Sequence, residues 1–336
     1  MIAKHRNKLP QSGDRQFLTD EGLETWLSFH ERLEIPLFAA FTILDSRQGR
    51  AALDRYMVKF GKTAVRQKMG FIMSTPTRRA SSRWATELGI TSATLKDMHQ
   101  QAILYLHSLR EGLETYTSPF VLNGVLGPRE DGYNPNRQMC VIEASEYHAQ
   151  QIEWFAEFAA DMVSASTMTY VEEALGIAKA AKRGGMPSVI SFTLETDGRL
   201  PSGQSLSDAI RQVDTETDET AAYFMINCGH PARFIDVLKE GGRWTKRIKG
   251  VRAKVSPTCH EVSDNAWQPD DRSPEYLASQ YQELGQVLPN MTIMGGCCGT
   301  DHRHIGAIGA ACANARTNRP ANPCLQCRNA ASASDL

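Results

Sequence analysis

Two adjacent cysteines framed by glycines form the strongest chemical signal in the sequence. Cys297 and Cys298 stand between Gly296 and Gly299, where a predicted strand ends. In a regular strand neighbouring side chains point to opposite faces, so this pair can share one ion only if the backbone leaves that geometry. The glycines permit the departure because they adopt backbone angles that are closed to other residues. A third thiol, Cys228, ends another predicted strand and is available to the same site.

Three thiolates favour zinc over calcium, magnesium or manganese, which prefer oxygen ligands. They fill three corners of a tetrahedral site and leave the fourth open, which is the pattern of catalytic rather than structural zinc. A substrate thiol in the open corner would lose its proton, whereas a free thiol with a pKa of about 8.5 is only slightly ionised at neutral pH. The residues alone leave zinc binding and simple burial of the cysteines equally open.

The chain has eight cysteines, and the other five are Cys140, Cys259, Cys312, Cys324 and Cys327. A disulfide framework is typical of short exported chains, whereas this chain has 336 residues and no signal-like segment. Lone cysteines such as Cys140 and Cys312 are expected to be small core residues. The Cys324-x-x-Cys327 motif resembles half of a zinc knuckle or a redox pair, but no second half lies nearby.

Eight short apolar segments alternate with amphipathic ones, which predicts a parallel sheet, and eight repeats favour its closure. The predicted strands are Phe17–Asp20, Phe71–Thr75, Phe120–Val125, Asp161–Thr167, Ser188–Glu195, Tyr223–Cys228, Gly250–Val255 and Thr292–Gly296. The predicted helices are Arg47–Lys68, Leu95–Glu114, Glu143–Ala160, Tyr170–Arg183, Ala232–Lys239, Pro274–Leu284 and His302–Ala315. The alternative, an open doubly wound sheet, lacks support because neither G-x-G-x-x-G after the first strand nor a P-loop occurs.

The expected fold class is therefore α/β, a single-domain (β/α)8 TIM barrel. Residues 17–316 form the barrel, residues 1–16 an N-terminal arm and residues 317–336 a flexible C-terminal tail. A long loop is expected at Asp197–Ser207, on the catalytic face. In a closed barrel the sixth and eighth strands have one strand between them, so Cys228 can face the cysteine pair.

Charge and hydropathy limit the classes of partner that this chain is expected to bind. The formal net charge is -1, so no basic surplus indicates nucleic acid or a membrane surface. The longest apolar run, Ile35–Leu44, is too short to span a bilayer. A cytoplasmic protein with small-molecule substrates is expected, and a homo-oligomer is compatible with the sequence.

With these residues in view, the chain resembles the homocysteine S-methyltransferase family from about Phe17 to Ile308. The most specific segments are Asn227-Cys228 and Gly295-Gly296-Cys297-Cys298-Gly299-Thr300, and weaker ones are Thr19–Thr25, Ser74–Thr77, Gly124–Pro128 and Asp161–Val163. The resemblance implies a barrel with Zn²⁺ held by Cys228, Cys297 and Cys298. It also implies methyl transfer from a donor such as S-methylmethionine, S-adenosylmethionine or betaine to homocysteine, which gives methionine.

The match departs from the family pattern where the acceptor is expected. The first strand of the family usually ends Asp-Gly-Gly, whereas this chain has Asp20-Glu21-Gly22. Many relatives hold the amino group of homocysteine with a Glu where this chain has Ser166, and commonly carry Asn where it has Lys254. Asp20 and Glu21 are expected to recognise a substrate ammonium and Lys254 an acidic group. Acceptors other than homocysteine, a different thiol or a selenol, stay open, as does a non-catalytic zinc- or thiol-binding barrel.

Further residues are expected to support this site. The substrate-binding set expected around the zinc is Asp20, Glu21, Thr25, Ser166, Asn227 and Lys254. Asn227 is also expected to orient its neighbouring zinc ligand by a hydrogen bond. Asp301 is expected to cap the last helix. Gly124 and Gly127 are expected to give backbone clearance, while Arg78-Arg79 either binds a carboxylate or faces solvent. His302-x-His304 is expected to be a polar lining rather than a ligand pair.

Overall fold

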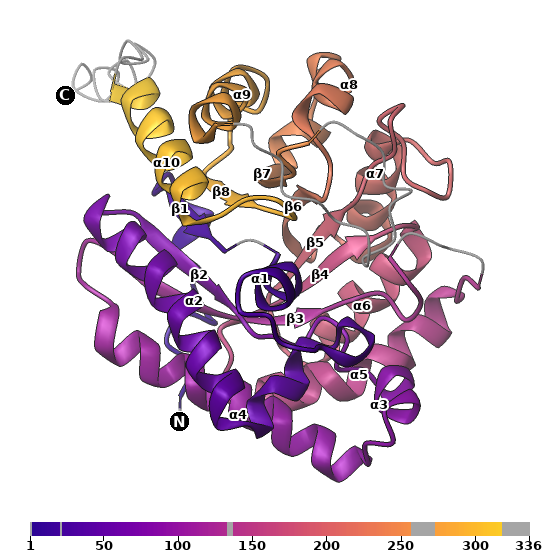
Figure 1. Ribbon diagram of the computed structural model, residues 1–336. Helices are drawn as coiled ribbons and strands as arrows, with labels where there is room; N and C mark the ends of the chain where they lie inside the picture. Colours follow the sequence, from indigo (N-terminus) through magenta and orange to yellow (C-terminus); the bar gives the residue numbers. More distant parts are fainter. Residues whose placement is uncertain (1, 21, 133–136, 257–272, 318–336) are drawn as a thin grey trace, which may run out of the picture.

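Eight parallel strands close into a barrel in sequence order (Figure 1). The computed structural model describes residues 2–20, 22–132, 137–256 and 273–317, and side chains only as far as residue 313. The strands are β1 (Phe17–Thr19), β2 (Gly70–Ser74), β3 (Phe120–Leu126), β4 (Met162–Met168), β5 (Ser188–Phe192), β6 (Ala221–Asn227), β7 (Ile248–Ala253) and β8 (Ile293–Gly296). The barrel closes where Phe17 of β1 pairs with Ile293 of β8. This closure confirms the predicted TIM barrel and excludes the open sheet.

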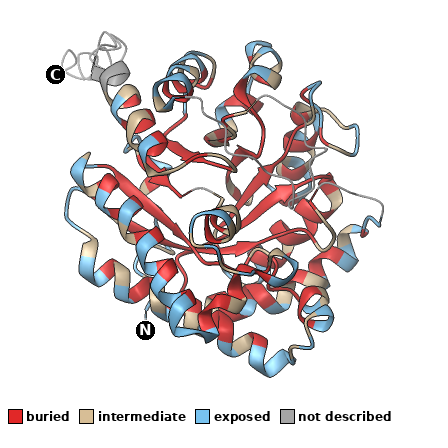
Figure 2. Cartoon of the chain, viewed as in Figure 1, coloured by how far each residue is buried: buried red, intermediate tan, exposed pale blue. Residues whose placement is uncertain are grey.

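Helices surround the strands and bury one face each against them (Figure 2). The longer helices are α2 (Arg47–Arg66), α4 (Ser92–Leu113), α5 (Val141–Glu157), α6 (Val171–Arg183), α7 (Leu206–Thr217), α9 (Pro274–Val287) and α10 (His302–Thr317), and the shorter ones are α1 (Leu23–Phe29), α3 (Ser82–Glu87) and α8 (Ile235–Lys239). Helices α2, α4, α7 and α9 begin after Ser46, Thr91, Ser205 and Ser273, each of which accepts a backbone N–H from the first turn. These side chains satisfy donors that a helix start otherwise leaves unpaired.

Helices α1, α3 and α7 are absent from the sequence-based prediction. Helices α1 and α3 are too short for an apolar period to stand out. In α7 the buried residues Leu206, Ala209, Ile210 and Val213 follow the helical spacing i, i+3, i+4 and i+7, so this helix could have been found. A long loop was expected at Asp197–Ser207, in front of α7. In the structure this loop ends at Ser205, which pairs with Arg199 in an isolated β-bridge.

The arm before β1 closes the amino-terminal end of the barrel. Leu9 packs with Phe17, Tyr223 and other side chains of the barrel interior. Gln11 is fully buried, and its Nε2 donates to the Tyr223 hydroxyl at 3.2 Å. This end is therefore filled by protein, which leaves the carboxyl-terminal end for a ligand.

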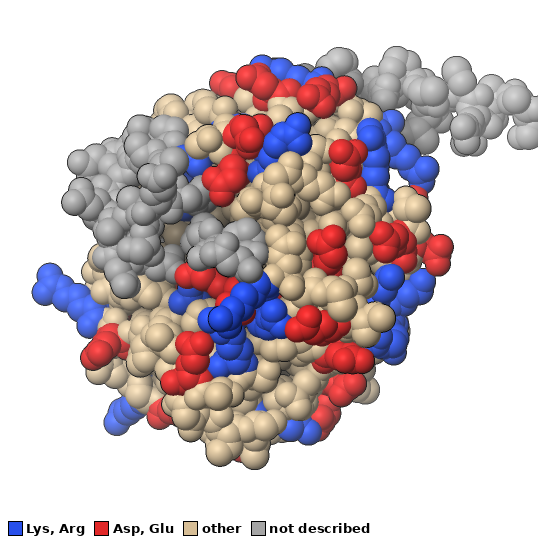
Figure 3. All heavy atoms as spheres, turned by 90° about the vertical axis from the view of Figure 1, so that its right-hand side faces the viewer, with Lys and Arg blue, Asp and Glu red and all other residues tan. Residues whose placement is uncertain are grey.

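The described surface carries both signs of charge. On the face shown in Figure 3, acidic and basic side chains are interspersed. In the described part of the chain, no helix is both long and apolar enough to cross a bilayer.

Candidate active site

A pocket opens at the carboxyl-terminal ends of the strands, where barrel enzymes carry their chemistry. Its wall includes the start of α1, which lies in front of the strands in Figure 1. The lining residues are Asp20, Gly22, Leu23, Glu24, Thr25, Phe38, Ser74, Thr75, Pro76, Arg78, Val125, Ser166, Thr167, Asn227, Cys228, Arg252, Cys297 and Cys298. All three predicted zinc ligands therefore reach the same pocket.

Strand β7 brings the distant cysteines together. The backbone N–H of Cys228, after β6, donates to the carbonyl of Arg252 at 3.1 Å. The N–H of Cys297, after β8, donates to the carbonyl of Ala253 at 3.0 Å. Since these two carbonyls belong to adjacent residues of β7, the two thiols are held at one point of the rim, as predicted from the strand order.

The backbone around the cysteines leaves regular strand geometry. Cys228 has φ 60°, a left-handed conformation that costs free energy for a residue other than glycine. After β8 the chain turns so tightly that a Cβ on Gly296 would lie 1.9 Å from Thr300 Oγ1. Thr300 Oγ1 fastens this turn by donating to the Cys297 carbonyl at 2.8 Å. Glycine at position 296 is therefore needed for this tight turn, in agreement with the turn predicted from the sequence.

The donor set and one spacing fit zinc. The sulfur atoms of Cys297 and Cys298 lie 4.0 Å apart. Zinc–sulfur bonds of about 2.3 Å at tetrahedral angles would separate two sulfurs by about 3.8 Å. Among the described side chains, no group of three or more His, Cys, Asp or Glu residues is already arranged as a metal site. The fit therefore rests on ligand chemistry and on the spacing of the cysteine pair.

The three thiols share their protons unequally. The hydrogen bond with Cys297 lowers the pKa of Cys228 well below the ordinary value, against the effect of burial, and the charges of Lys254 and Arg78 lower it further. The hydrogen bond with Cys297 also lowers the pKa of Cys298. The same two bonds raise the pKa of Cys297 well above the ordinary value. The ionisation of each thiol therefore depends on its neighbours, which suits a site where one cation is shared by all three sulfurs.

Asn227 uses its whole side-chain amide to join three strand ends. Its Oδ1 accepts from the Ser191 hydroxyl at 2.6 Å and from the Thr167 N–H at 3.0 Å. Its Nδ2 donates to Thr167 Oγ1 at 2.8 Å and to Cys228 Sγ at 3.2 Å. Thr167, like Cys228, has a positive φ, of 62°. The expected bond from Asn227 to its neighbouring cysteine is therefore present, and it steadies two strained turns.

Of the other predicted binding residues, some line the pocket and others do not. Thr25 donates its hydroxyl to Cys298 Sγ at 3.5 Å. Ser166 lines the pocket at the end of β4. Lys254 is not among the residues that line the pocket. Burial acts to lower the pKa of Lys254, but the charges of the three cysteine sulfurs outweigh that effect and raise the pKa. Glu21 lies outside the described residues.

Asp20 meets an arginine that the sequence prediction missed. Its Oδ1 accepts from Arg252 Nη2 at 3.0 Å, and also from the hydroxyls of Thr19 at 3.0 Å and Ser74 at 3.2 Å. Burial raises the pKa of Asp20, and the Arg252 charge opposes that shift. Gly295 leaves room for the pair, since a Cβ there would lie 3.2 Å from Arg252 Cγ. A sequence signal was available, because alternation in the predicted strand Gly250–Val255 puts Arg252 on the same face as Lys254, two positions on.

The loop after β3 covers the Arg78 side of the pocket. A Cβ on Gly132 would lie 3.0 Å from Thr167 Cγ2 and 3.2 Å from Arg78 Nη2. A Cβ on Gly127 would lie 2.2 Å from the Arg78 carbonyl, and one on Gly124 would lie 2.5 Å from the Phe155 ring. The expected clearance at Gly124 and Gly127 is confirmed.

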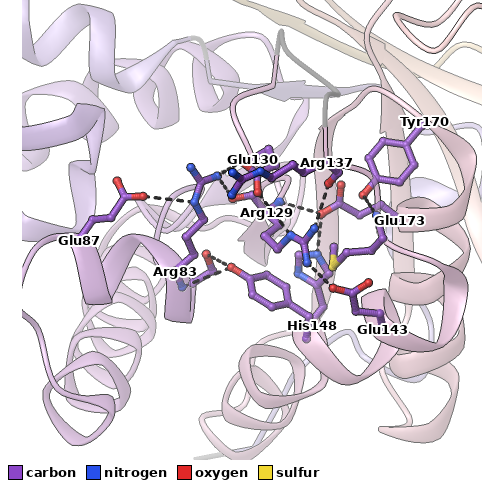
Figure 4. Close-up of polar contacts among 12 residues, drawn as sticks. Arg83, Glu87, Arg129, Glu130, Arg137, Glu143, His148, Tyr170 and Glu173 are labelled. Atoms are coloured by element: carbon purple, nitrogen blue, oxygen red, sulfur yellow. Dashed lines mark hydrogen bonds and ion pairs between the residues drawn. The ribbon is translucent and has the colours of Figure 1, made fainter.

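Ion pairs hold this loop against α3, α5 and α6 (Figure 4). Arg83 pairs with Glu130, and Arg129 pairs with Glu143. The Arg129 N–H also donates to Glu173 Oε1 at 2.7 Å, and that oxygen lies 2.9 Å from His148 Nε2. The loop beside Arg78 is thus fastened at several points.

The second arginine of the Arg78-Arg79 pair is structural. Arg79 is buried, lies 4.4 Å from the centre of the Trp84 ring and pairs with Asp131 at 3.4 Å. Arg78 lines the pocket. The two alternatives for this dipeptide were carboxylate binding and exposure to solvent. Of the two side chains, that of Arg78 is the one placed where it could contact a ligand.

The remaining predictions have mixed outcomes. Asp301 Oδ1 accepts the N–H groups of Arg303 at 2.8 Å and His304 at 3.4 Å, which confirms the predicted cap of α10. Cys312 is buried as expected, but Cys140 is exposed, so the expectation of a core residue is wrong there. Cys140 is the residue before the first turn of α5, and its side chain is exposed at this helix boundary. The expectation that His302 and His304 form a polar lining is wrong, because neither residue lines the pocket. His304 is instead buried, with its Nδ1 3.1 Å from Asp301 Oδ1. Cys259, Cys324, Cys327 and residues 318–336 lie outside the described residues.

Comparisons with known proteins agree with this geometry. A family model for homocysteine S-methyltransferase matches residues 24–312. A search of curated protein sequences found no match. The fold is similar to the metallated form of the homocysteine methyltransferase MmuM from Escherichia coli, with a TM-score of 0.69, 16% identity and coverage of 89% of this chain and 96% of that chain. Its oxidized form gives a TM-score of 0.70 and 16% identity, with 90% of this chain and 97% of that chain covered. Because the family model spans most of the sequence, this chain belongs to the homocysteine S-methyltransferase family of enzymes.

Proposed function

We propose that this enzyme binds zinc through Cys228, Cys297 and Cys298 and transfers a methyl group from a sulfonium donor to a thiol. The observation that carries the proposal is the convergence of three thiols from two strand ends on one pocket. S-methylmethionine and S-adenosylmethionine are the proposed donors. Homocysteine is the proposed acceptor, and methionine is then the product.

The proposed reaction is a direct displacement. Zinc, when bound, supplies a Lewis acid that keeps the acceptor sulfur ionised at neutral pH. A bond forms between that sulfur and the methyl carbon while the methyl–sulfur bond of the donor breaks, and the electron pair stays on the departing sulfur. The departing thioether is neutral and takes up no proton, so the site needs no general acid.

The residues of the chain then have positioning and electrostatic roles. Asn227 holds Cys228 in its strained conformation, and Thr25 orients Cys298. The positive charge of Lys254 offsets negative charge on the cysteine sulfurs. The fastened loop after β3 helps to enclose the reactants, which favours their alignment and excludes water.

The direct test is to incubate zinc-loaded enzyme with S-methylmethionine or S-adenosylmethionine and homocysteine, and to follow methionine by mass spectrometry. Methionine formation supports the proposal. Turnover with another thiol or a selenol but not with homocysteine would keep the chemistry and change the acceptor. Metal binding without turnover on a panel of thiols would instead indicate a non-catalytic barrel.

The ligand assignment has a separate test. Replacing Cys297 by Ser removes one of three ligands, so we expect bound zinc to fall and transfer to drop by more than about a thousandfold. Cys312→Ser is the matched control, because Cys312 is a buried thiol that is not part of the pocket lining. Metal analysis and circular dichroism measure both variants. Unchanged zinc content in the Cys297 variant would refute the assignment.

A further inference from the structure

Strand β7 lies between the two strands that end in cysteines, and its backbone holds both of them. The Arg252 carbonyl accepts the Cys228 N–H at 3.1 Å. The carbonyl of the next residue, Ala253, accepts the Cys297 N–H at 3.0 Å. A shift of this short segment would therefore displace the cysteines. Metal sites tolerate little displacement of this kind, because the ligand distances must match the ion closely.

A tyrosine outside the barrel contacts this segment of β7. Tyr281 belongs to α9, which Figure 1 shows outside β7 and β8. Its hydroxyl oxygen accepts the Ala253 N–H at 3.1 Å, and its proton is directed at the Val251 carbonyl at 2.9 Å and at the Gly295 carbonyl. Gly295 stands two residues before Cys297. One side-chain oxygen thus joins the ends of the two neighbouring strands just before the cysteine turn.

The pattern of α9 explains why this side chain faces the barrel. The buried residues Leu277, Tyr281 and Leu284 follow the spacing i, i+4 and i+7, so they share one helix face. Tyr281 is fully buried there. A phenylalanine would fill the same space, whereas a buried hydroxyl costs free energy unless it is hydrogen-bonded. The contacts with the strand backbones offset that cost and fix the hydroxyl at one position.

We propose that Tyr281 is a positioning residue of the zinc site, whose hydroxyl holds the ends of β7 and β8 so that Cys228 and Cys297 keep the spacing that a metal ion requires. This inference rests on the proposed zinc binding and extends it to a helix outside the pocket. Tyr281 is not part of the pocket lining, so it acts through the strand backbones. Asn227 and Thr25 each contact one cysteine sulfur, whereas Tyr281 supports the backbone that positions two.

Zinc affinity of Tyr281→Phe tests this role, since the variant lacks the hydroxyl and keeps the ring in its packed position. We expect the affinity to fall about tenfold, because contacts behind the ligands of a metal typically contribute about 10–100-fold. Tyr223→Phe is the matched control, since Tyr223 is also buried and its hydroxyl bonds Gln11 at the opposite end of the barrel. Its zinc affinity should equal that of the native enzyme.

Competition with a chelator measures the zinc affinity, and circular dichroism confirms that both variants fold. A fall in Tyr281→Phe alone supports the inference. Unchanged affinity in Tyr281→Phe, or an equal fall in Tyr223→Phe, would overturn it.

Hydrogen exchange of the metal-free enzyme gives a second measurement that needs no zinc. We expect the backbone N–H groups of residues 251–253 and 293–297 to exchange about threefold to tenfold faster in Tyr281→Phe, because the hydroxyl no longer joins the two strands. In Tyr223→Phe these residues should exchange at the native rate. Native exchange rates in Tyr281→Phe would show that the hydroxyl does not hold the strand ends, and would overturn the inference.

The two measurements separate this inference from the proposed function. Zinc binding and methyl transfer by the native enzyme, with native affinity and exchange in Tyr281→Phe, would retain the proposed function and remove the role of Tyr281. An absence of zinc binding by the native cysteines would remove the proposed function and with it the zinc site, while faster exchange in Tyr281→Phe would still show that the hydroxyl holds the strand ends.

Discussion

The two ends of the barrel each carry an aspartate–arginine pair, but only one pair faces a cavity. At the amino-terminal end, Asp161 pairs with Arg110 at 2.9 Å, and their side chains are 0% and 8% exposed. At the carboxyl-terminal end, Asp20 pairs with Arg252 at 3.0 Å, and both residues line the pocket. The chemistry of the two pairs is the same, and their access to a ligand differs.

The difference follows from what covers each end. The N-terminal arm lies over the amino-terminal end, and the His5 N–H donates to Asp161 Oδ1 at 2.8 Å. Asp161 Oδ2 also accepts the Leu122 N–H at 2.9 Å, so this carboxylate is held entirely by the protein. The closed pair can therefore serve only the fold, whereas the pair at the mouth can also exchange partners with a substrate. Strained residues such as Cys228 and Thr167 occur at the same open end.

The largest expected effect comes from breaking the closed pair. Arg110→Met leaves the Asp161 charge buried without its cation, so we expect the free energy of unfolding to fall by about 3–5 kcal/mol. The rate of methyl transfer per folded molecule should not change. Arg211→Met is the control, because it removes an exposed pair with Asp208 and should cost less than about 1 kcal/mol. Urea unfolding measures both variants, and equal losses would contradict the comparison.

The next effect concerns the pH dependence of stability and comes from His99, a fully buried residue of α4 beside Gln151 of α5. Burial lowers the pKa of His99 to about 4, against its bond with the Leu95 carbonyl. The folded state therefore keeps His99 neutral while the unfolded state takes up a proton below about pH 6.5. We expect His99 to contribute a loss of stability of about 3 kcal/mol as the pH falls from about 6.5 to about 4.

This pH dependence is measured by urea unfolding of the native enzyme and of His99→Leu at several pH values. Gln151 Nε2, which lies 3.1 Å from His99 Nε2, keeps a second acceptor in the Ala80 carbonyl at 2.7 Å. The variant should lose stability less steeply over this range. Identical slopes would show that other groups cause the acid sensitivity.

Breaking the pair at the mouth should cost less stability than breaking the closed pair. Arg252→Met leaves Asp20 with two hydroxyl donors and with access to water in the pocket. We expect the free energy of unfolding to fall by about 1–3 kcal/mol. Unlike Arg110→Met, this variant should also reduce kcat/KM for methyl transfer per folded molecule, because Arg252 lines the pocket. A loss of stability as large as that of Arg110→Met, with unchanged kcat/KM, would remove the proposed distinction between the ends.

The smallest expected effect comes from Asn227→Ala, which removes the bond to Cys228 Sγ. Loss of such a supporting contact typically reduces metal affinity or activity by about 10–100-fold. We expect this reduction in zinc affinity at the mouth. Ser191→Ala is the control, since it removes one donor to Asn227 and leaves the bond to Cys228 in place. Zinc affinity is measured by competition with a chelator, and an equal reduction in both variants would contradict the role of Asn227.

The sequence by itself determined the features that depend on local pattern. The alternation of apolar and amphipathic segments is repeated eight times, which predicts a parallel sheet and favours the closed barrel that the strands form. The glycines around Cys297 and Cys298 reveal a turn because few other residues fit its geometry. The Asp301 cap follows for the same reason, since a helix start needs an acceptor within the neighbouring turn.

Only the tertiary structure decided which distant groups meet. Arg252 and Asp20 are separated by 232 positions, and their contact depends on the closure of β1 against β8 and the register of β7. The left-handed conformation of Cys228 likewise depends on neighbouring strands, since its N–H donates to the Arg252 carbonyl of β7. Sequence patterns report the local preference of each segment, whereas the charge of the pocket depends on the distances between segments. For that reason the barrel and its cysteines could be predicted, and the contact between Arg252 and Asp20 could not.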